Sequence, residues 1–207
     1  MDVQRIKRKY RHTAWLYDGL IAPATDRLRR EAVARLGLRT GDRVLDLGCG
    51  TGLSIPLLRQ AVGDAGTVYG IEVSPDMLAI ARRKATDGTW QNVRLFEADA
   101  ETFELEELLD GMLCFYVHDI TMSSTALPHA MKFLKPAGRL VAAGGKLARG
   151  WRGWLINPVT VAYALPFITT FDRSRPPFTI VLELIPECYV EERLLGSQYL
   201  AWGTRPR

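Results

Sequence analysis

The sequence is poor in cysteine, and its three cysteines lie far apart. Cys49, Cys114 and Cys188 match no metal-binding spacing, and an odd number argues against a disulfide framework. We therefore expect reduced, structural thiols and no metal site. The chain also shows no low-complexity run, no internal repeat and no apolar signal core after Met1. These absences exclude a small disulfide scaffold and a repeat protein, and they predict an intracellular, cytoplasmic protein.

The length and the charge distribution limit the domain organisation. A chain of 207 residues suits one α/β domain with a sizeable core and is short for two, so we treat residues 1–207 as a single domain. Within the first 40 residues, ten Lys or Arg stand against four acids, a net charge of +6, whereas the rest of the chain is slightly acidic. This asymmetry indicates an anionic partner or surface for the N-terminal segment.

The most informative stretch is the sequence RVLDLGCGTG at residues 43–52. A short apolar run is followed at once by glycines at alternate positions, which is typical of a buried strand that enters a tight turn. Glycine suits such a turn because the backbone needs unusual angles and a ligand must approach the main chain closely. The pattern predicts a nucleotide-type site at Gly48, Gly50 and Gly52, although an ordinary strand-to-helix turn remains the alternative.

The spacing of these glycines selects the ligand. A dinucleotide-binding turn has the pattern Gly-x-Gly-x-x-Gly, which places pyrophosphate at a helix N-terminus. Here the pattern is Asp46-x-Gly48-x-Gly50-x-Gly52, and an acid in front of the first glycine would repel pyrophosphate and attract a cation. The stretch resembles the first motif of the class I methyltransferases that depend on S-adenosylmethionine (SAM), a ligand with an ammonium and a sulfonium but no phosphate.

Downstream residues extend this resemblance. Glu72 ends a predicted strand at 67–73, and its carboxylate can accept hydrogen bonds from both ribose hydroxyls. The sequence SPDM at 74–77 opens a helix and places Met77 against the adenine, while the resemblance implies that Asp99 binds the adenine amino group. Asp46 and the glycines would hold the methionine end. The expected SAM-binding residues are Asp46, Gly48, Cys49, Gly50, Gly52, Glu72, Val73, Met77, Asp99, Ala100 and Tyr116.

A fourth strand is expected at 111–117, and its end should face the transferred methyl group. Tyr116, His118 and Asp119 would project there. His118 is a candidate general base, with an orienting or packing role as the alternative. Methyltransferases of exocyclic base amines carry Asn or Asp followed by Pro-Pro-Tyr at this place, and the sequence here is FYVH. Base amino methylation is therefore not expected, and the acceptor-side candidates are Tyr10, Tyr17, Tyr116 and His118.

The first 40 residues are expected to form helices that cap the site. Apolar residues recur at helical spacing from Val3 to Tyr17, and basic residues crowd the other faces. Such a helix can lie on an anionic membrane, close over a substrate or simply cover the sheet. Tyr17 and Asp18 resemble a pair that introduces capping helices in the ubiquinone/menaquinone methyltransferases and in bacterial phospholipid N-methyltransferases. A further helix is expected at 24–36.

The C-terminal third departs from the family pattern. After a helix at 126–134 and a turn at 136–138, a fifth strand is expected at 139–143, and residues 151–171 then carry a single charge. Asn157, Pro158 and Pro166 argue against a membrane span there. We expect an apolar insert at 145–178 that walls the acceptor site or touches lipid, then a short helix at 177–185 and a tight hairpin at 188–203.

The elements together predict a fold and an activity. Five parallel strands with helices and a C-terminal antiparallel hairpin make the Rossmann-like, doubly wound, seven-stranded sheet that the resemblance implies. The basic helix and the apolar insert favour a lipophilic acceptor, first a phospholipid amine of the phosphatidylethanolamine type and second an isoprenoid quinone or apolar secondary metabolite. The alternatives are a soluble small-molecule O-methyltransferase and a non-catalytic SAM- or nucleic-acid-binding module. Membrane association through residues 1–17 is a further expectation.

Overall fold

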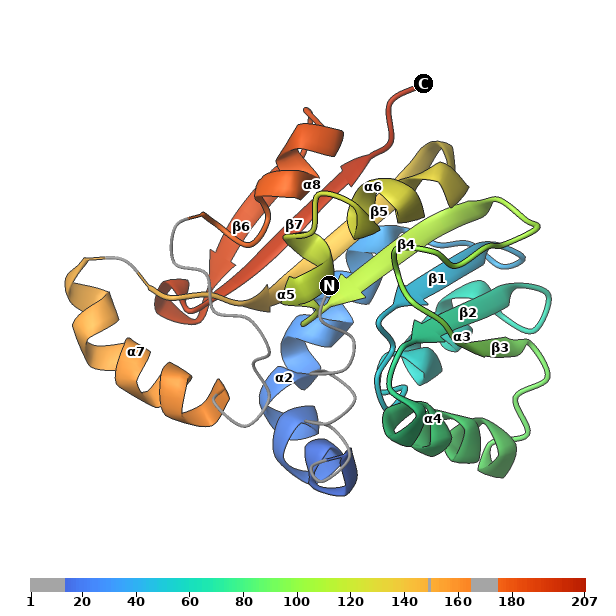
Figure 1. Ribbon diagram of the computed structural model, residues 1–207, viewed down its shortest axis with the longest axis horizontal. Helices are drawn as coiled ribbons and strands as arrows, with labels where there is room; N and C mark the ends of the chain where they lie inside the picture. The colour runs from blue at the N-terminus through green and yellow to red at the C-terminus, as the bar shows by residue number, and fades with distance from the viewer. Residues whose placement is uncertain (1–13, 149, 165–174) are drawn as a thin grey trace.

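A computed structural model describes residues 14–148, 150–164 and 175–207 (Figure 1). One seven-stranded sheet has the order β3-β2-β1-β4-β5-β7-β6; the first five strands are parallel, and β7 runs antiparallel to both of its neighbours. This confirms the predicted Rossmann-like sheet with its C-terminal hairpin. The strands are β1 Arg43–Leu47, β2 Thr67–Glu72, β3 Val93–Glu97, β4 Leu109–Phe115, β5 Leu134–Gly145, β6 Tyr189–Arg193 and β7 Gln198–Thr204.

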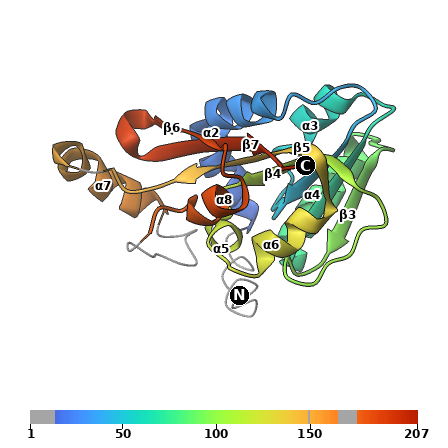
Figure 2. The same cartoon turned by 90° about the horizontal axis from the view of Figure 1, so that it is seen from above.

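Helices cover both faces of the sheet. Figure 2 shows α2 and α3 on one face and α5, α6 and α8 on the other. The helices are α2 Ala14–Leu36, α3 Ile55–Val62, α4 Pro75–Asp87, α5 His118–Thr121, α6 Ala126–Ala130, α7 Trp151–Ala164 and α8 Thr179–Leu184, with short 3₁₀ turns η1 at Met131–Phe133 and η2 at Leu194–Gly196.

The alternation of side chains along the central strands produces two cores. Met112 and Cys114 of β4 pack with α5, α6 and α8, whereas Leu113 between them packs with α2 and α3. All three are fully buried. Because successive side chains in a strand point to opposite faces, a continuous apolar run such as β4 requires helices on both sides.

The N-terminal helix is longer than the sequence predicts. Residues 14–36 form one helix that includes Pro23, where we expected a break before residue 24. Proline removes one helical hydrogen bond, from its own nitrogen to the carbonyl of Gly19. Both residues are exposed, so water can satisfy that carbonyl and the helix continues. The predicted basic helix before Ala14, including Tyr10, lies outside the described residues.

The boundaries around β4 and β5 also differ from the prediction. Strand β4 begins and ends two residues earlier than expected, and Val117 caps helix α5 instead of extending the strand. The predicted turn at 136–138 is a bulge inside β5: the register jumps from Leu134 opposite Leu109 to Arg139 opposite Gly111. The predicted helix at 126–134 is consequently shorter, with α6 and η1 leading directly into β5.

The C-terminal hairpin forms, but its connection is wider than predicted. Arg193 pairs with Gln198, so four residues, and not a two-residue turn, join β6 to β7. Leu194, Leu195 and Gly196 all have positive φ, at 46°, 56° and 90°. The expected short helix after Pro177 is α8.

Within the apolar insert predicted at 145–178, residues 151–164 form helix α7, whereas residues 149 and 165–174, Pro166 among them, lie outside the described part of the chain. Asn157 and Pro158 lie inside the helix without ending it. The Asn157 side chain accepts a hydrogen bond from the backbone N–H of Ala148 (2.9 Å) and donates one to its carbonyl (3.1 Å), which anchors α7 to the loop after β5. Among the described residues, no helix has the length and apolar character needed to cross a membrane.

Candidate functional site

The predicted SAM-binding residues meet at one edge of the sheet. Strands β1 to β4 are parallel, and Asp46 pairs in register with Gly70 of β2 and Leu113 of β4. The turn after β1, residue Glu72 at the end of β2, and Asp99 just after β3 therefore share the carboxyl edge of the sheet. In open α/β sheets, this edge, where the strand order reverses, is the usual ligand site.

The three turn glycines all have positive φ, at 73°, 55° and 78° for Gly48, Gly50 and Gly52. Their surroundings differ. A Cβ at position 48 would lie 2.5 Å from Val117 Cγ1, and one at position 52 would lie 3.1 Å from Ala81 Cβ. A Cβ at position 50 would meet nothing closer than Met77 Cε at 3.6 Å. Glycine at positions 48 and 52 therefore allows Val117 and Ala81 to pack against the turn. At position 50 a Cβ would meet no close neighbour, so there is room beside the main chain.

Glu72 holds this turn in place. The backbone N–H of Gly50 donates to its Oε2 (2.9 Å), and the N–H of Ser74 donates to its Oε1 (2.8 Å). Burial raises the pKa of Glu72, and these backbone hydrogen bonds oppose the rise. Because each carboxylate oxygen has a second lone pair, both oxygens can still accept the ribose hydroxyls that the sequence assigns to them.

Asp46 is the most unusual group at the edge. It is only 2% exposed, and within the described part of the chain its Oδ2 has no hydrogen-bond partner. Burial raises its pKa to about 7, the positive charge of Arg29 lowers it, and the charge of Glu72 raises it. A buried carboxylate with an unused oxygen fits the ammonium group of SAM, and the open space at Gly50 fits a ligand that lies against the backbone.

Arg29 is a residue that sequence reasoning missed. It comes from α2, is 3% exposed, lies over the Phe115 ring at 4.9 Å and donates to Thr25 Oγ1 (2.7 Å). The sequence contains a signal for this residue, because Thr25 and Arg29 fall on the same helical stripe as the apolar residues Leu28 and Ala32. A cation on an apolar stripe indicates a buried partner for it, and here its charge acts on Asp46.

The residues expected around the adenine divide into two groups. Met77 is buried beside Gly50, and Val73 is half-buried at the end of β2. Asp99 Oδ1 accepts the backbone N–H of Glu101 (2.9 Å), which leaves Oδ2 for another donor. Cys49 is different: its thiol is buried against Gly70, where a Cβ would lie 3.0 Å from its sulfur. The Cys49 side chain therefore packs, and Ala100 is likewise part of the core.

On the predicted acceptor side, Tyr116 and His118 flank Val117 just after β4. Tyr116 has φ of 59°, and its hydroxyl accepts a hydrogen bond from Gln198 Nε2 (3.0 Å). His118 Nε2 lies 2.6 Å from the carbonyl oxygen of Gly145, so this nitrogen carries the proton and Nδ1 is left as an acceptor. Burial lowers the pKa of His118, and this hydrogen bond opposes the shift. The side chain of Tyr17 is outside the described part of the structure.

A second feature that the sequence did not reveal ties α2 to the glycine turn. Asp18 accepts a hydrogen bond from Thr51 Oγ1 (2.5 Å) and forms an ion pair with Lys84 of α4 (2.6 Å). Lys84 also donates to the Thr51 carbonyl (2.9 Å). The resemblance of the Tyr17-Asp18 pair was the available signal, but the partners lie more than 30 residues away in the chain.

We predict that Asp18→Asn weakens this connection without unfolding the protein. The charge of the ion pair is lost, and because the group is partly exposed the cost is about 1 kcal/mol. The KM for SAM should rise about fivefold, because a cost of about 1 kcal/mol in binding corresponds to about a fivefold change in affinity. The kcat should change little. Steady-state kinetics would check this. The matched control is Asp26→Asn, which breaks an exposed pair with Arg30 on the same helix; an equal effect of both variants would contradict the prediction.

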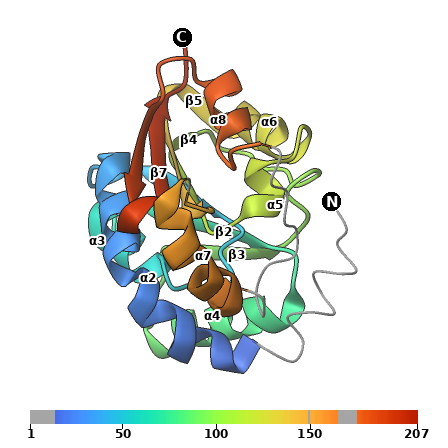
Figure 3. The same cartoon turned by 90° about the vertical axis from the view of Figure 1, so that its left-hand side faces the viewer.

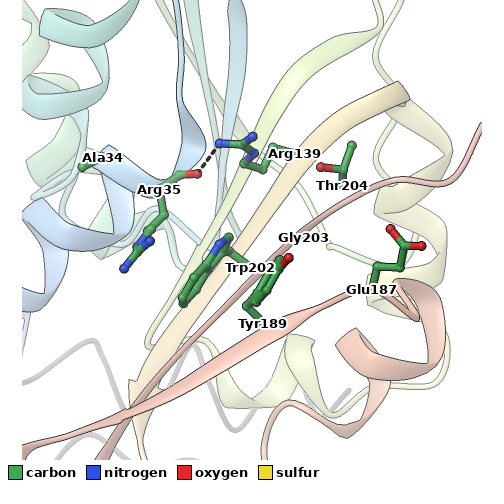
Figure 4. A pocket seen from close by; sticks show the side chains of 8 residues that line it. All are labelled: Ala34, Arg35, Arg139, Glu187, Tyr189, Trp202, Gly203 and Thr204. Carbon is green, nitrogen blue, oxygen red and sulfur yellow. Dashed lines mark hydrogen bonds between the residues drawn. The ribbon is translucent and has the colours of Figure 1, made fainter.

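A pocket of about 430 Å³ lies elsewhere (Figure 4). It is lined by Arg35 and Arg139, by the stacked rings of Tyr189 and Trp202, and by their neighbours. Arg139 pairs with Thr204, at the opposite end of β5 from Gly145. The pocket therefore opens at the amino ends of the parallel strands, away from the glycine turn, and it is not the site described above.

Comparisons with known proteins agree with the sequence resemblance. A methyltransferase-domain family matches residues 44–138. Aklanonic acid methyltransferase DauC of Streptomyces sp. (strain C5) is 31% identical over 198 residues, which cover 87% of this chain and 80% of DauC. The ubiquinone/menaquinone biosynthesis C-methyltransferase UbiE of Pseudomonas syringae pv. syringae (strain B728a) is 33% identical over 130 residues, 61% of this chain and 51% of UbiE; the chain therefore matches only about half of UbiE.

A solved structure shows the same fold. The N-methyltransferase NodS from Bradyrhizobium japonicum WM9, in complex with S-adenosyl-L-homocysteine, superposes with a TM-score of 0.69 at 19% identity, covering 98% of this chain and 99% of NodS.

Proposed function

Because this chain belongs to the SAM-dependent methyltransferases, a family whose cofactor is SAM, we propose that it transfers the methyl group to a lipophilic small molecule such as an isoprenoid quinone or an apolar secondary metabolite. The observation that carries this proposal is the likeness to DauC over most of both chains, together with the part shared with UbiE. Their names give aklanonic acid and ubiquinone/menaquinone biosynthesis as their contexts.

We assign the cofactor to the carboxyl edge of β1 to β3. Asp46 would receive the ammonium group, the open face of Gly50 the methionine backbone, Glu72 the ribose, and Met77 with Asp99 the adenine. When bound, SAM supplies an electrophilic methyl group. Asp46 supports this assignment best, because an ammonium ion would satisfy a buried carboxylate whose Oδ2 has no hydrogen bond from the residues that the structure describes.

The acceptor would lie beside Tyr116 and His118. Since the pKa of His118 is lowered and its Nε2 proton is held by Gly145, the imidazole is neutral at pH 7 and presents Nδ1 as a base. Such a base suits an acceptor whose hydroxyl, carboxyl or activated carbon must lose a proton. The fixed ring also orients the acceptor, which is the main contribution of a protein to methyl transfer between two bound groups.

A phospholipid amine of the phosphatidylethanolamine type is a second candidate. It is favoured by the basic residues concentrated in the first 40 positions, which suit an anionic lipid surface. The two candidates share a lipophilic acceptor and differ in the methylated atom.

The proposal is tested by incubating the protein with methyl-labelled SAM and, separately, a quinone precursor extract, a total phospholipid extract and total RNA. Label in the organic phase with the first extract is the expected result, and label in the phospholipid supports the second candidate. His118→Gln should lower the rate at least about a hundredfold, the small end of general-base effects, while SAM binding stays intact.

Two results would overturn the proposed function, and a third would overturn only the role of His118. Label confined to RNA would show a nucleic-acid substrate. Tight SAM binding without turnover on any extract would indicate a non-catalytic module. Equal turnover of the His118→Gln variant and the wild type would remove His118 from the chemistry.

A further inference from the structure

Helix α7 presents large apolar side chains to solvent on one face. Trp151, Trp154 and Leu155 are 72%, 89% and 69% exposed. Positions three and four apart lie on the same side of a helix, so these three side chains form one stripe. The opposite side is fixed to the protein, because Gly153 packs closely on the Ala148 carbonyl and Asn157 makes two hydrogen bonds to Ala148. The outward direction of the tryptophans is therefore set by the anchored side.

The tip of the C-terminal hairpin extends this apolar surface. Turn η2 packs against α7, and its residues Leu194 and Leu195 are 65% and 61% exposed. Both leucines have positive φ, a conformation that costs a bulky side chain energy and is kept only where the surrounding structure imposes it. We call the five residues Trp151, Trp154, Leu155, Leu194 and Leu195 the apolar tip.

The place of the apolar tip relates it to the site. Helix α7 follows the carboxyl end of β5, where Gly145 contacts His118. Figures 1 and 2 show α7 extending from that end of the sheet, beyond the other helices. Figure 3 views the molecule from the side on which α7 lies. The apolar tip thus lies on the proposed acceptor side of the molecule, with its side chains largely exposed.

The charges around the tip favour an anionic partner. The sequence has no acid between Asp119 and Asp172, and every charged residue from position 144 to position 164 is a Lys or Arg. The acid of the hairpin nearest the tip, Glu192, is already in an ion pair with Lys146 (2.7 Å). This segment therefore combines exposed tryptophan and leucine with cationic residues and has no acid of its own. Such a composition is typical of segments that lie at the interface of an anionic bilayer.

From this arrangement we propose that the apolar tip is a membrane-docking surface, which inserts its tryptophans and leucines into the headgroup boundary of an anionic bilayer. The inference deepens the proposed function, since a lipophilic acceptor would be collected from that bilayer. A helix lying in the interface would bring the carboxyl edge of β4 and β5 close to the lipid.

Vesicle flotation tests this docking without cofactor or acceptor. The wild type should float with vesicles of phosphatidylcholine and phosphatidylglycerol and bind pure phosphatidylcholine more weakly. The double variant Trp154→Ser/Leu155→Ser, with the basic N-terminal segment intact, should lose at least about tenfold in affinity, because apolar burial supplies much of interfacial binding. The matched control is Leu108→Ser, an exposed leucine before β4, which should bind as the wild type does.

Two outcomes would overturn the docking surface. Unchanged flotation of the double variant would assign membrane binding to other residues. A wild type that is dimeric and a double variant that is monomeric by sedimentation would show that the tip binds a second copy. Thermal melting confirms that the variants are folded. The outcome is separate from that of the labelling experiment: loss of flotation with retained methylation of a detergent-dispersed acceptor leaves the proposed function standing, and flotation without turnover removes only that function.

Discussion

Asp46→Asn is expected to weaken SAM binding about 100-fold while making the protein without cofactor more stable. The carboxylate is buried and its Oδ2 has no hydrogen-bond partner among the described residues. An amide removes the charge that would hold the ammonium group, and loss of one partner of a buried charge pair costs about 2–5 kcal/mol. Isothermal titration with SAM measures the affinity, and denaturant unfolding measures the stability.

The stability gain should depend on pH in a definite direction. The folded-state pKa of Asp46 is about 7, above the ordinary value, so between pH 4 and 7 the folded protein keeps a proton that the unfolded chain has lost. The free energy of unfolding therefore falls by up to about 4 kcal/mol as pH rises through this window, and it levels off at higher pH. Asp46→Asn should remove this slope, and its gain in unfolding free energy over the wild type should be greatest at pH 8.

The same titration links pH to cofactor affinity. Below pH 7 a cation must displace the proton of Asp46, so the ratio of wild-type to Asp46→Asn affinity should fall as pH decreases from 8 to 5. A constant ratio over that range, or equal SAM affinity of the two proteins, would contradict the assigned role of Asp46.

Gly48→Ala and Gly50→Ala should separate folding from binding within one turn. Both positions have positive φ, which costs alanine about 1 kcal/mol. At position 48 the new Cβ also meets Val117 Cγ1 at 2.5 Å, so we expect a total loss of about 3 kcal/mol, or roughly 10 °C in Tm for a domain of this size. At position 50 only the first cost applies, but the methyl group occupies the space assigned to the cofactor.

Gly50→Ala is therefore expected to keep most of its stability and to bind SAM at least about tenfold more weakly, a change of about 1.4 kcal/mol. Thermal melting with and without SAM measures both effects. The added substitution Val117→Ala should recover part of the stability of Gly48→Ala, because it removes the clash but not the backbone strain. If the Gly48→Ala variant has the same Tm as the wild type, the packing of this turn against Val117 is not as described.

Much of the fold follows from local patterns in the sequence. The strand predicted at 67–73 is β2 Thr67–Glu72, and the capping side chain of Ser74 and the proline after it start α4 as expected. Such features depend on neighbours within a few residues, which is why periodicity and turn chemistry predict them. One error occurs where a distant contact overrides local preference, because the bulge in β5 is set by its pairing with β4. Another is at Pro23, where exposure to water lets the helix continue past the proline.

The order of acids and glycines along the chain was enough to predict where Asp46, Glu72 and Asp99 meet, because parallel strands bring their carboxyl ends to one edge. The sequence by itself thus determined the sheet, the glycine turn and the edge of the sheet at which these acids lie. Only the tertiary structure decided which groups act on them. The charge of Arg29 acts on Asp46, Thr51 donates to Asp18, and His118 bonds to the Gly145 carbonyl, and each of these interactions joins segments far apart in the chain. The exposed face of α7 likewise depends on how that helix is anchored. Periodicity carries no information about such partners, since they depend on how the helices pack on the finished sheet.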